Sequence, residues 1–307
     1  MNAISRRDFL QYSSRLSALL GLGAGAVPEL AQALENLATG AAPVLWLQGQ
    51  SCSGCSVSLL DSEAPTPAQL LTQYISLCFH QTLSTATGHV AVDTVNKTIA
   101  RGGYLLCVEG AVPAGMPRAC TFGDEPFGTQ LLRAARNAKA IVTVGTCACH
   151  GGIPAAENNP TGSVSASEYL LANGVQAPSI AIPGCPPHPD WIVGTLAHVL
   201  KFGLPPMDQA GRPKAFFGRL LHDQCPRFAD YERENYAREL GDEGCLFKLG
   251  CLGPITSADC TVRNWNGAIN NCIKSRAPCI GCASKDFAKR THFPMLTQNL
   301  SGTTGGR

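Results

Sequence analysis

The sequence has little charge and almost no imbalance between its two signs. Only 15% of the 307 residues are charged, and the formal net charge at pH 7 is +2. A basic surface that would bind a nucleic-acid backbone is therefore not expected, and neither is an acidic tail. Hydrophobic residues make up 45% of the chain, which is enough for one large core or two smaller ones and excludes a disordered protein.

Long apolar runs are also missing. The apolar stretch 16–27 is too short to cross a bilayer, and no later run is long enough either. This stretch follows Arg6 and Arg7 and precedes Ala31-Gln32-Ala33, a small-residue pattern typical of cleavage sites. We therefore predict that residues 1–33 are a twin-arginine export leader, which would carry the folded protein to the periplasm. The alternative is an ordinary amphipathic N-terminal helix.

Cysteine, by contrast, is abundant. The chain has 15 cysteines, an odd number that cannot all pair as disulfides within one chain. An exported protein with many cysteines would ordinarily contain disulfides, so a disulfide-rich binding protein is one alternative. Some thiols must nevertheless be free or bound to another group.

Strand-like runs occupy the first part of the mature chain. Short, continuous apolar runs alternate there with helical stretches such as 128–139. The runs cover residues 44–47, 104–108, 140–144 and 179–182. Such runs are typical of buried parallel strands, so an α/β domain with a parallel sheet is predicted for residues 43–204.

The second part, residues 205–307, has a different composition. Cysteine, glycine and proline interrupt it too often for a conventional apolar core, although short helices are expected around 228–240. Something other than apolar burial is expected to hold this irregular, cysteine-rich domain together.

Four cysteines follow the ends of predicted strands. Cys52 and Cys55 come after the first strand, and Cys147 and Cys185 each come after a later one. Because the loops at the carboxyl ends of parallel strands meet at one crevice, these four thiols are expected to converge. Four thiolates suit tetrahedral zinc or an iron–sulfur cluster, and their spacing does not choose between the two.

A denser pattern of ligand-type residues occupies the second part. It consists of eight residues: His222, Cys225, Cys245, Cys251, Cys260, Cys272, Cys279 and Cys282. Eight residues suffice for two further sites with four ligands each. On its own His222 would be interpreted as a surface or capping histidine, but Cys225 three residues later favours a ligand.

The motifs that carry these residues resemble those of one protein family. The segments are LQGQSCSGCSVSLL, VGTCACHGGIPAA, IPGCPPHPDWIVGTL, FFGRLLHDQCPR, LGCLGPITSADC and PCIGC. They are similar, in the same order, to those of the small, electron-transferring subunit of nickel–iron hydrogenases, and the resemblance extends from the leader to about Phe287. It implies a flavodoxin-like domain at 43–204, an iron–sulfur domain at 205–307, and a separate large subunit that holds the catalytic metals.

The resemblance also implies which residues bind each of three iron–sulfur clusters. The proximal 4Fe–4S cluster, nearest the catalytic metals, is assigned to Cys52, Cys55, Cys147 and Cys185. The distal 4Fe–4S cluster, near the surface, is assigned to His222, Cys225, Cys245 and Cys251. The medial cluster between them is assigned to Cys260, Cys279 and Cys282, with Cys272 as its fourth ligand.

Cys272 departs from the commonest pattern of this family. In that pattern a proline stands at the fourth medial position and the cluster is of the 3Fe–4S type. Cys272 instead implies a 4Fe–4S medial cluster, as in the nickel–iron–selenium branch, and a 3Fe–4S cluster is expected if it is not a ligand. Gly54 and Gly152 occupy positions where the oxygen-tolerant branch has additional cysteines, so an ordinary proximal cluster is expected.

The remaining residues with reactive side chains are given structural interpretations. Four cysteines remain: Cys78, Cys107, Cys120 and Cys149. Free cysteine commonly behaves as a small buried hydrophobe, which fits Cys107 and Cys78, whereas the role of Cys120, in a polar loop, is left open. Glu109 is expected to cap a loop, and the alternative is that it borders the proximal site or relays protons. His188 is expected to fix the proline-rich turn after Cys185. The external electron acceptor that the resemblance implies is a cytochrome c or a membrane cytochrome subunit.

Two alternatives make different predictions. A subunit of the respiratory NADH dehydrogenase type would share the first domain, but in that family the first two ligands are adjacent cysteines and the two later sites are missing. A disulfide-rich binding protein would explain neither the odd number of cysteines nor the histidine among them.

Overall fold

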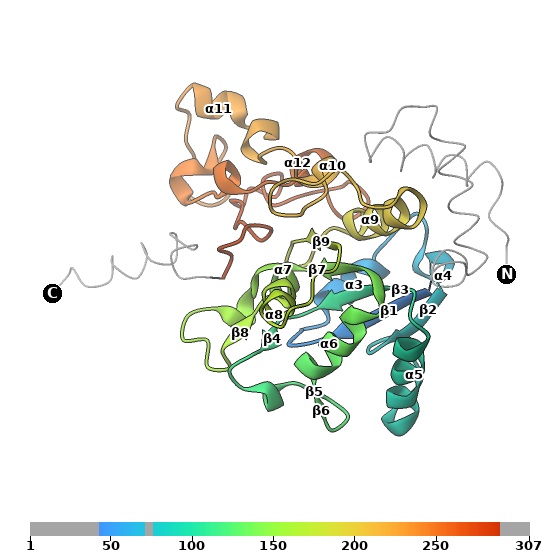
Figure 1. Cartoon of the computed structure of the whole chain (residues 1–307). Coiled ribbons are helices and arrows are strands. Elements are labelled where there is room, and N and C mark those ends of the chain that lie inside the picture. Colours follow the sequence, from blue (N-terminus) through green and yellow to red (C-terminus); the bar gives the residue numbers. More distant parts are fainter. Residues whose placement is uncertain (1–42, 71–75, 289–307) are drawn as a thin grey trace, which may run out of the picture.

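The computed structural model describes residues 43–70 and 76–288 (Figure 1). The predicted export leader, residues 1–33, lies outside the described residues. Within the described ranges, no helix combines the length and the apolar character needed to cross a membrane.

Five parallel strands form the central sheet. In spatial order they are β2 (Ser76–His80), β1 (Pro43–Gln48), β3 (Tyr104–Glu109), β7 (Ala138–Val144) and β9 (Ser179–Ile182). In chain order this is the arrangement 2-1-3-4-5 of flavodoxin-like folds. The predicted α/β fold with a flavodoxin-like parallel sheet is therefore confirmed.

Helices and short hairpins surround the sheet. The helices of the first part are α3 (Gly54–Leu60), α4 (Pro67–Gln69), α5 (Gly88–Arg101), α6 (Phe127–Arg136), α7 (Thr146–His150), α8 (Ala166–Ala172) and α9 (Pro189–Phe202). The short 3-10 turns there are η3 (Pro117–Ala119) and η4 (Ile153–Ala155). Two antiparallel pairs complete this part: β4 (Val112–Pro113) with β8 (Ser163–Val164), and β5 (Thr121–Phe122) with β6 (Glu125–Pro126).

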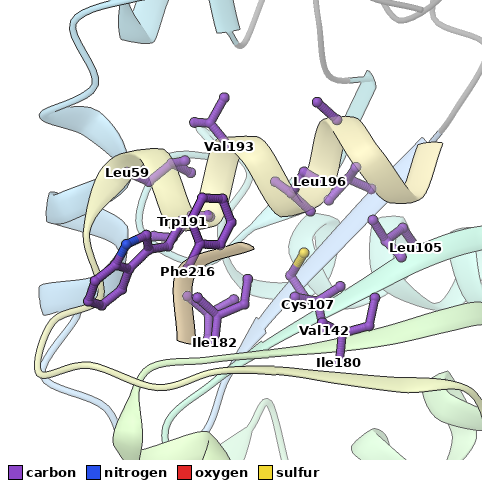
Figure 2. Close-up of a cluster of buried hydrophobic side chains, with 14 of the residues drawn as sticks. Leu59, Leu105, Cys107, Val142, Ile180, Ile182, Trp191, Val193, Leu196 and Phe216 are labelled. Atoms are coloured by element: carbon purple, nitrogen blue, oxygen red, sulfur yellow. The ribbon is translucent and has the colours of Figure 1, made fainter. Parts of the chain in front are cut away.

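The sheet has an apolar core on each face because successive strand residues point to opposite sides. In β1, Val44 and Trp46 belong to one core, whereas Leu45 and Leu47 belong to the other. Figure 2 shows the first core, in which side chains of α9 pack onto the strands. The second core packs against α5, α6 and α8. Burial on both faces explains why the strands were visible as continuous apolar runs.

The part that begins near residue 205 is built from short turns and helices. They are α10 (Lys214–Phe217), η5 (His222–Gln224), α11 (Phe228–Glu232), η6 (Leu246–Leu249), η7 (Gly253–Ile255) and α12 (Cys260–Arg263). Its own apolar cluster is small and consists of Leu221, Ala237, Leu246, Ile273 and Cys279. In Figure 1 this part, drawn in orange and red, lies on the side of the sheet that α9 covers.

One predicted helix ends earlier than expected. The helix predicted at 128–139 is α6, which ends at Arg136, because strand β7 already begins at Ala138. The short helix expected around 228–240 is confirmed as α11, which ends at Glu232. Glu234 then adopts a φ of 57°, outside the helical region, and the backbone of Ala237 bonds to Cys245 instead of continuing a helix.

Candidate metal centres

The first group of predicted ligands lies at the carboxyl edge of the sheet. Cys52 and Cys55 follow β1, Cys147 lies in α7 directly after β7, and Cys185 follows β9. Burial raises the pKa of the Cys55 thiol, and the charges of its neighbours raise it further: Glu109, Cys147, Cys185 and Cys52. The structure therefore brings together the four thiols that were predicted to converge.

Glycines make room for these thiols. A Cβ atom on Gly145 would lie 2.3 Å from Cys55 Sγ, and one on Gly152 would lie 2.8 Å from Cys147 Sγ. Both glycines also have positive φ values, 89° and 51°, which side chains disfavour. The space between the loops thus depends on residues without a side chain, as expected for loops that approach a bound group closely.

Glu109 is a buried carboxylate at the end of β3. Its Oε1 accepts hydrogen bonds from Ser51 Oγ (2.8 Å) and from the backbone N–H of Cys55 (3.2 Å). Its Oε2 accepts from Trp46 Nε1, at 3.1 Å, and from the Ser56 hydroxyl. The carboxylate therefore caps the first turn of α3. It also borders the first ligand group, because its charge raises the pKa of Cys55 and of Cys147.

His80 stands behind this carboxylate and was not recognised from the sequence. Its Nε2 lies 3.2 Å from Ser56 Oγ, and its Nδ1 accepts from the backbone N–H of Thr82 at 3.1 Å. Burial lowers the pKa of His80 to about 4, even though the charge of Glu109 acts to raise it. His80 is therefore neutral near pH 7 and extends the hydrogen-bond chain that holds Glu109.

The second group lines a small pocket of about 10 Å³. Four of the residues that line it are predicted ligands: His222, Cys225, Cys245 and Cys251. The other walls are largely apolar, with Leu221, Leu246 and Ile273 among them. The ring of His222 is held edge-on by Phe228 at 5.1 Å and Tyr231 at 4.6 Å between ring centroids. This pocket provides three thiols and one imidazole among mostly apolar walls.

The third group lies between the first two. Burial raises the pKa of Cys260 well above its usual value, and Cys282, Asp259 and Cys279 raise it further. Burial likewise raises the pKa of Cys279 to about 12. Cys272 is exposed, but it lies near enough to Cys282 for its charge to raise the pKa of that thiol. The structure therefore gathers Cys260, Cys279 and Cys282, with Cys272 at the border of the group.

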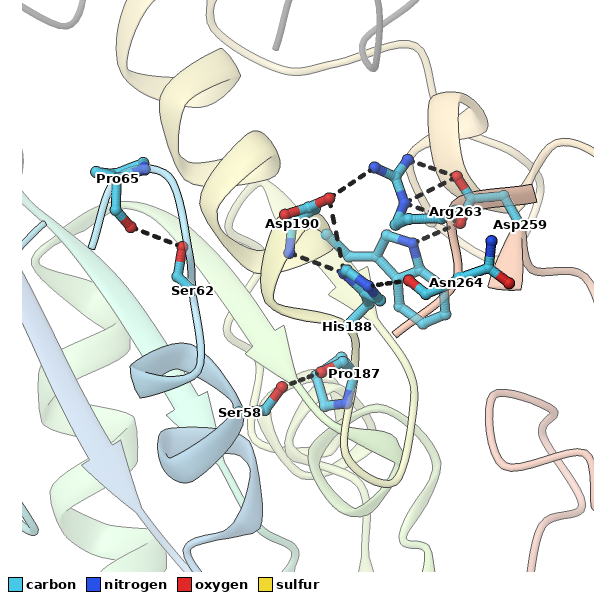
Figure 3. Close-up of polar contacts among 10 residues, drawn as sticks. Ser58, Ser62, Pro65, Pro187, His188, Asp190, Asp259, Arg263 and Asn264 are labelled. Carbon is cyan, nitrogen blue, oxygen red and sulfur yellow. Dashed lines mark hydrogen bonds and ion pairs between the residues drawn. The ribbon is translucent and has the colours of Figure 1, made fainter. Parts of the chain in front are cut away.

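A network of partly buried polar side chains joins α9 to α12 (Figure 3). Arg263 forms ion pairs with Asp190, at 2.9 Å, and with Asp259. Trp191 Nε1 donates to Asp259 Oδ1 at 2.7 Å. Because α9 follows the Cys185 loop and α12 begins at Cys260, this network fixes the first and third groups relative to each other.

His188 fixes the turn after Cys185, as expected. Its Nδ1 accepts from the backbone N–H of Asp190 at 3.1 Å, and its Nε2 is 2.8 Å from the carbonyl oxygen of Asn264 (Figure 3). The first bond caps α9, and the second reaches the residue that follows α12. The histidine thereby anchors the turn to both parts of the chain.

The four spare cysteines differ in their surroundings. Cys107 and Cys149 are buried, as expected of small hydrophobes, and Cys149 lies 3.3 Å from the Thr143 hydroxyl. Cys78 and Cys120 are only half-buried, so the expectation was too strong for Cys78, while Cys120 packs against the second apolar core. The reason at Cys78 is its place on β2, the edge strand, where Arg101 Nη2 donates to its sulfur at 3.2 Å.

Two family models match successive parts of the chain. Residues 52–199 match a model described as NADH ubiquinone oxidoreductase, 20 Kd subunit. Residues 217–294 match a model that describes the C-terminal part of NiFe/NiFeSe hydrogenase small subunits.

Similar proteins cover nearly the whole chain. The periplasmic NiFeSe hydrogenase small subunit of Desulfomicrobium baculatum is 40% identical over 305 residues, covering 93% of this chain and 96% of that protein. The hydrogenase-2 small chain of Escherichia coli K12 is 37% identical over 297 residues, covering 92% and 77%.

Solved structures agree with these sequence matches. A NiFeSe hydrogenase structure from Desulfomicrobium baculatum superposes with a TM-score of 0.79 at 40% identity, covering 83% of this chain and 98% of that one. A NiFeSe hydrogenase structure from Desulfovibrio vulgaris Hildenborough gives a TM-score of 0.78 at 41% identity, covering 83% and 96%.

Proposed function

Because the chain belongs to the family of nickel–iron and nickel–iron–selenium hydrogenase small subunits, we propose that it is the electron-transfer subunit of a hydrogenase. The large subunit would hold the catalytic metals that split dihydrogen into two protons and two electrons. The single observation that carries this proposal is the match over 93% of the chain to a hydrogenase small subunit at 40% identity. The three groups of cysteine and histidine ligands support it independently.

We assign three iron–sulfur clusters to these groups. The proximal cluster is assigned to Cys52, Cys55, Cys147 and Cys185. The distal cluster is assigned to His222, Cys225, Cys245 and Cys251, and the medial cluster to Cys260, Cys272, Cys279 and Cys282. All three are proposed to be of the 4Fe–4S type, and the medial cluster is of the 3Fe–4S type if Cys272 is not a ligand. Such clusters, when bound, accept and release one electron at a time.

The proximal thiols lie within electrostatic reach of one another, because the charges of Cys147, Cys185 and Cys52 each raise the pKa of Cys55. Four thiolates suit either tetrahedral zinc or an iron–sulfur cluster. Membership of the hydrogenase small-subunit family is what favours iron–sulfur clusters here.

The role of the polypeptide is to bind the clusters, exclude water and set their potentials. Backbone N–H groups point at ligand sulfurs: Arg227 N–H donates to Cys225 Sγ and Gly281 N–H donates to Cys279 Sγ, both at 3.4 Å. Such bonds stabilise negative charge on sulfur and raise the reduction potential. An imidazole ligand from His222 would replace an anionic thiolate. This replacement would also raise the reduction potential of the distal cluster.

The same family membership suggests the roles of the two domains, the electron acceptor and the cellular location. Residues 43–204 would bind the proximal cluster and residues 205–307 the other two. The distal site near the surface would deliver electrons to a cytochrome c or a membrane cytochrome subunit. We propose that residues 1–33 direct folded export to the periplasm, where another subunit would attach the complex to the membrane.

A subunit of the NADH dehydrogenase type is the second candidate, because residues 52–199 match that family model. Two observations favour a hydrogenase instead. The first two proximal ligands, Cys52 and Cys55, are not adjacent, and residues 217–294 match the C-terminal model of hydrogenase small subunits.

Iron content tests the proposed function directly. The anaerobically purified heterodimer is expected to contain about twelve iron atoms and as many acid-labile sulfides on this chain, since three clusters hold four irons each. Iron and sulfide analysis, after subtraction of the iron in the large subunit, measures both. About four irons would leave the proximal cluster alone, and zinc in place of iron would refute the scheme.

A further inference from the structure

A cavity of about 550 Å³ lies outside the three ligand groups, between α5, the β5–β6 hairpin and α6. In Figure 1 these elements lie on the side of the sheet away from the orange and red part. The helices α5 and α6 follow β2 and β3, the two strands that flank β1, and ligands of parallel sheets bind near the carboxyl ends of the strands. Its volume is typical of small-molecule sites. The lining of this α5–α6 cavity includes Val92, Asn96, Phe122, Asp124, Glu125 and Gln130.

Gln130 contributes a buried amide to the wall of the α5–α6 cavity. The residue is only 2% exposed, and among the described residues its Oε1 has no hydrogen-bond partner. Leaving a buried amide oxygen unpaired costs free energy, and nearly all such groups in folded proteins are paired. An amide oxygen only accepts hydrogen bonds. A ligand that satisfies Gln130 must therefore bring an N–H or O–H group.

The hairpin adds two carboxylates to the cavity, and only one of them has a cationic partner. Arg133 of α6 donates to both oxygens of Glu125, at 3.1 and 2.8 Å, and so neutralises that side chain. Asp124 is exposed and forms no ion pair within the described part of the chain. One negative charge in the lining is thus uncompensated, which favours a ligand with positive charge.

The walls of the cavity are tied together by the same arginine. Arg133 also donates to Asn96 Oδ1, so it joins α6 both to the hairpin and to α5. Val92 of α5 and Phe122 of the hairpin add apolar surface beside the polar groups. A cavity whose walls are fixed before binding loses little entropy when a ligand enters. The α5–α6 cavity therefore combines one acceptor, one free carboxylate and an apolar wall in a preformed site.

We propose that the α5–α6 cavity binds a small organic amine in its protonated form. The ammonium group donates a hydrogen bond to Gln130 Oε1 and pairs with the carboxylate of Asp124. The apolar body of the amine packs against Val92 and Phe122. Binding is non-covalent, and it depends neither on the bound clusters nor on the proposed electron transfer.

The test is calorimetric titration of the purified heterodimer with phenethylamine, whose ring and ammonium group match the two kinds of wall. Saturable binding is expected. Phenethyl alcohol has the same ring and a hydrogen-bond donor but no charge, so it is expected to bind about 10-fold more weakly. Absence of saturable binding by the amine, or equal affinity for the alcohol, would overturn the inference.

Variants locate the binding in this cavity. Gln130→Leu removes the unpaired oxygen, so it is expected to weaken amine binding about 10-fold without lowering the thermal midpoint. Asp124→Asn changes an exposed side chain and is expected to weaken binding about 3-fold. Gln176→Leu is the matched control, because Gln176 is exposed after α8 and does not line the cavity.

These variants also separate the inference from the proposed function. Parental affinity in Asp124→Asn and in folded Gln130→Leu, or equal weakening in Gln176→Leu, would contradict binding in the α5–α6 cavity. Iron content and hydrogen–deuterium exchange are expected to stay parental in all three variants. A heterodimer that lacks iron would refute the proposed function and leave the titration as the test of the cavity.

Discussion

Replacing His222 by alanine is expected to slow electron delivery to an external acceptor by about 10- to 100-fold. Hydrogen–deuterium exchange at the large subunit is expected to stay near the parental level, because exchange needs no electron to leave the complex. The two assays, carried out on the same purified heterodimer, separate a defect in electron exit from a defect in catalysis.

The geometry of the second group is the reason for this expectation. His222 lines one pocket with Cys225, Cys245 and Cys251, and its ring is held by Phe228 and Tyr231. Alanine removes the imidazole and leaves three thiolates for a cluster that needs four ligands. His222→Cys would keep four ligands but add negative charge, so it is expected to retain iron and to lower the potential of the distal cluster.

His89→Ala is the matched control, because His89 is exposed at the start of α5 and belongs to no ligand group. It is expected to leave both assays unchanged. Equal losses of electron delivery and exchange in His222→Ala would mean that His222 is needed for folding or assembly rather than for electron exit.

The sheet could be predicted because most of its strands are buried on both faces. Strands β1, β3, β7 and β9 consist of continuous apolar runs. A helix or a strand with one face in solvent would instead show apolar residues alternating with polar ones. Strand β2 was not predicted, because it lies at the edge of the sheet and contains Ser76 and His80. His80 is buried there, and its contact with Ser56 joins segments 24 positions apart, which leaves no local pattern in the sequence.

The ligand groups were predictable for a different reason. Cysteine is rare enough, and its spacing regular enough, that C-x2-C pairs after strands indicate a binding site. The residues that position the ligands carry no such signal. The Thr146 hydroxyl donates a hydrogen bond to the carbonyl oxygen of Cys282, which is 136 positions away in the sequence. Glu109 accepts a hydrogen bond from the backbone N–H of Cys55, which is 54 positions away. The role of a single hydroxyl or carboxylate can be recognised only once the fold has brought those segments together.

The second part of the chain combines both cases. Its cysteines could be interpreted from the sequence. Its secondary structure could not be predicted, because short turns such as η5, η6 and η7 show no periodic pattern of hydrophobic residues. Its small apolar cluster includes Cys279, a proposed ligand. Ligand binding and apolar burial are therefore combined here, and the stability of this part is expected to depend on the bound clusters.

Replacing Cys272 by proline is expected to convert the medial cluster from four irons to three. Proline supplies no ligand atom, and a cube held by three thiolates tends to lose the iron without a protein ligand. Total iron should then fall by about one atom per complex. The oxidised variant should show a paramagnetic resonance signal that the parent lacks, because oxidised 4Fe–4S clusters are silent.

The surroundings of Cys272 make this variant a fair test. Cys272 is exposed, and its carbonyl oxygen accepts from the backbone N–H of Ala277 at 2.9 Å, a bond that proline retains. The neighbouring turn is held separately, since Asn271 bonds through its side chain to Asn264 at 2.6 Å. The substitution should therefore change the ligand set more than the fold.

Two further variants separate the loss of a ligand from the effect of proline on the backbone. Cys272→Ala removes the thiol without restricting φ and is expected to give the same three-iron signal. Cys78→Ala removes a half-buried thiol on β2 that belongs to no ligand group, and it is expected to leave iron and spectrum unchanged. An oxidised parent that already shows a stoichiometric three-iron signal, or a proline variant with unchanged iron, would exclude Cys272 as a ligand. Cys260, Cys279 and Cys282 would then hold a 3Fe–4S cluster, and Cys272 would count among the spare cysteines.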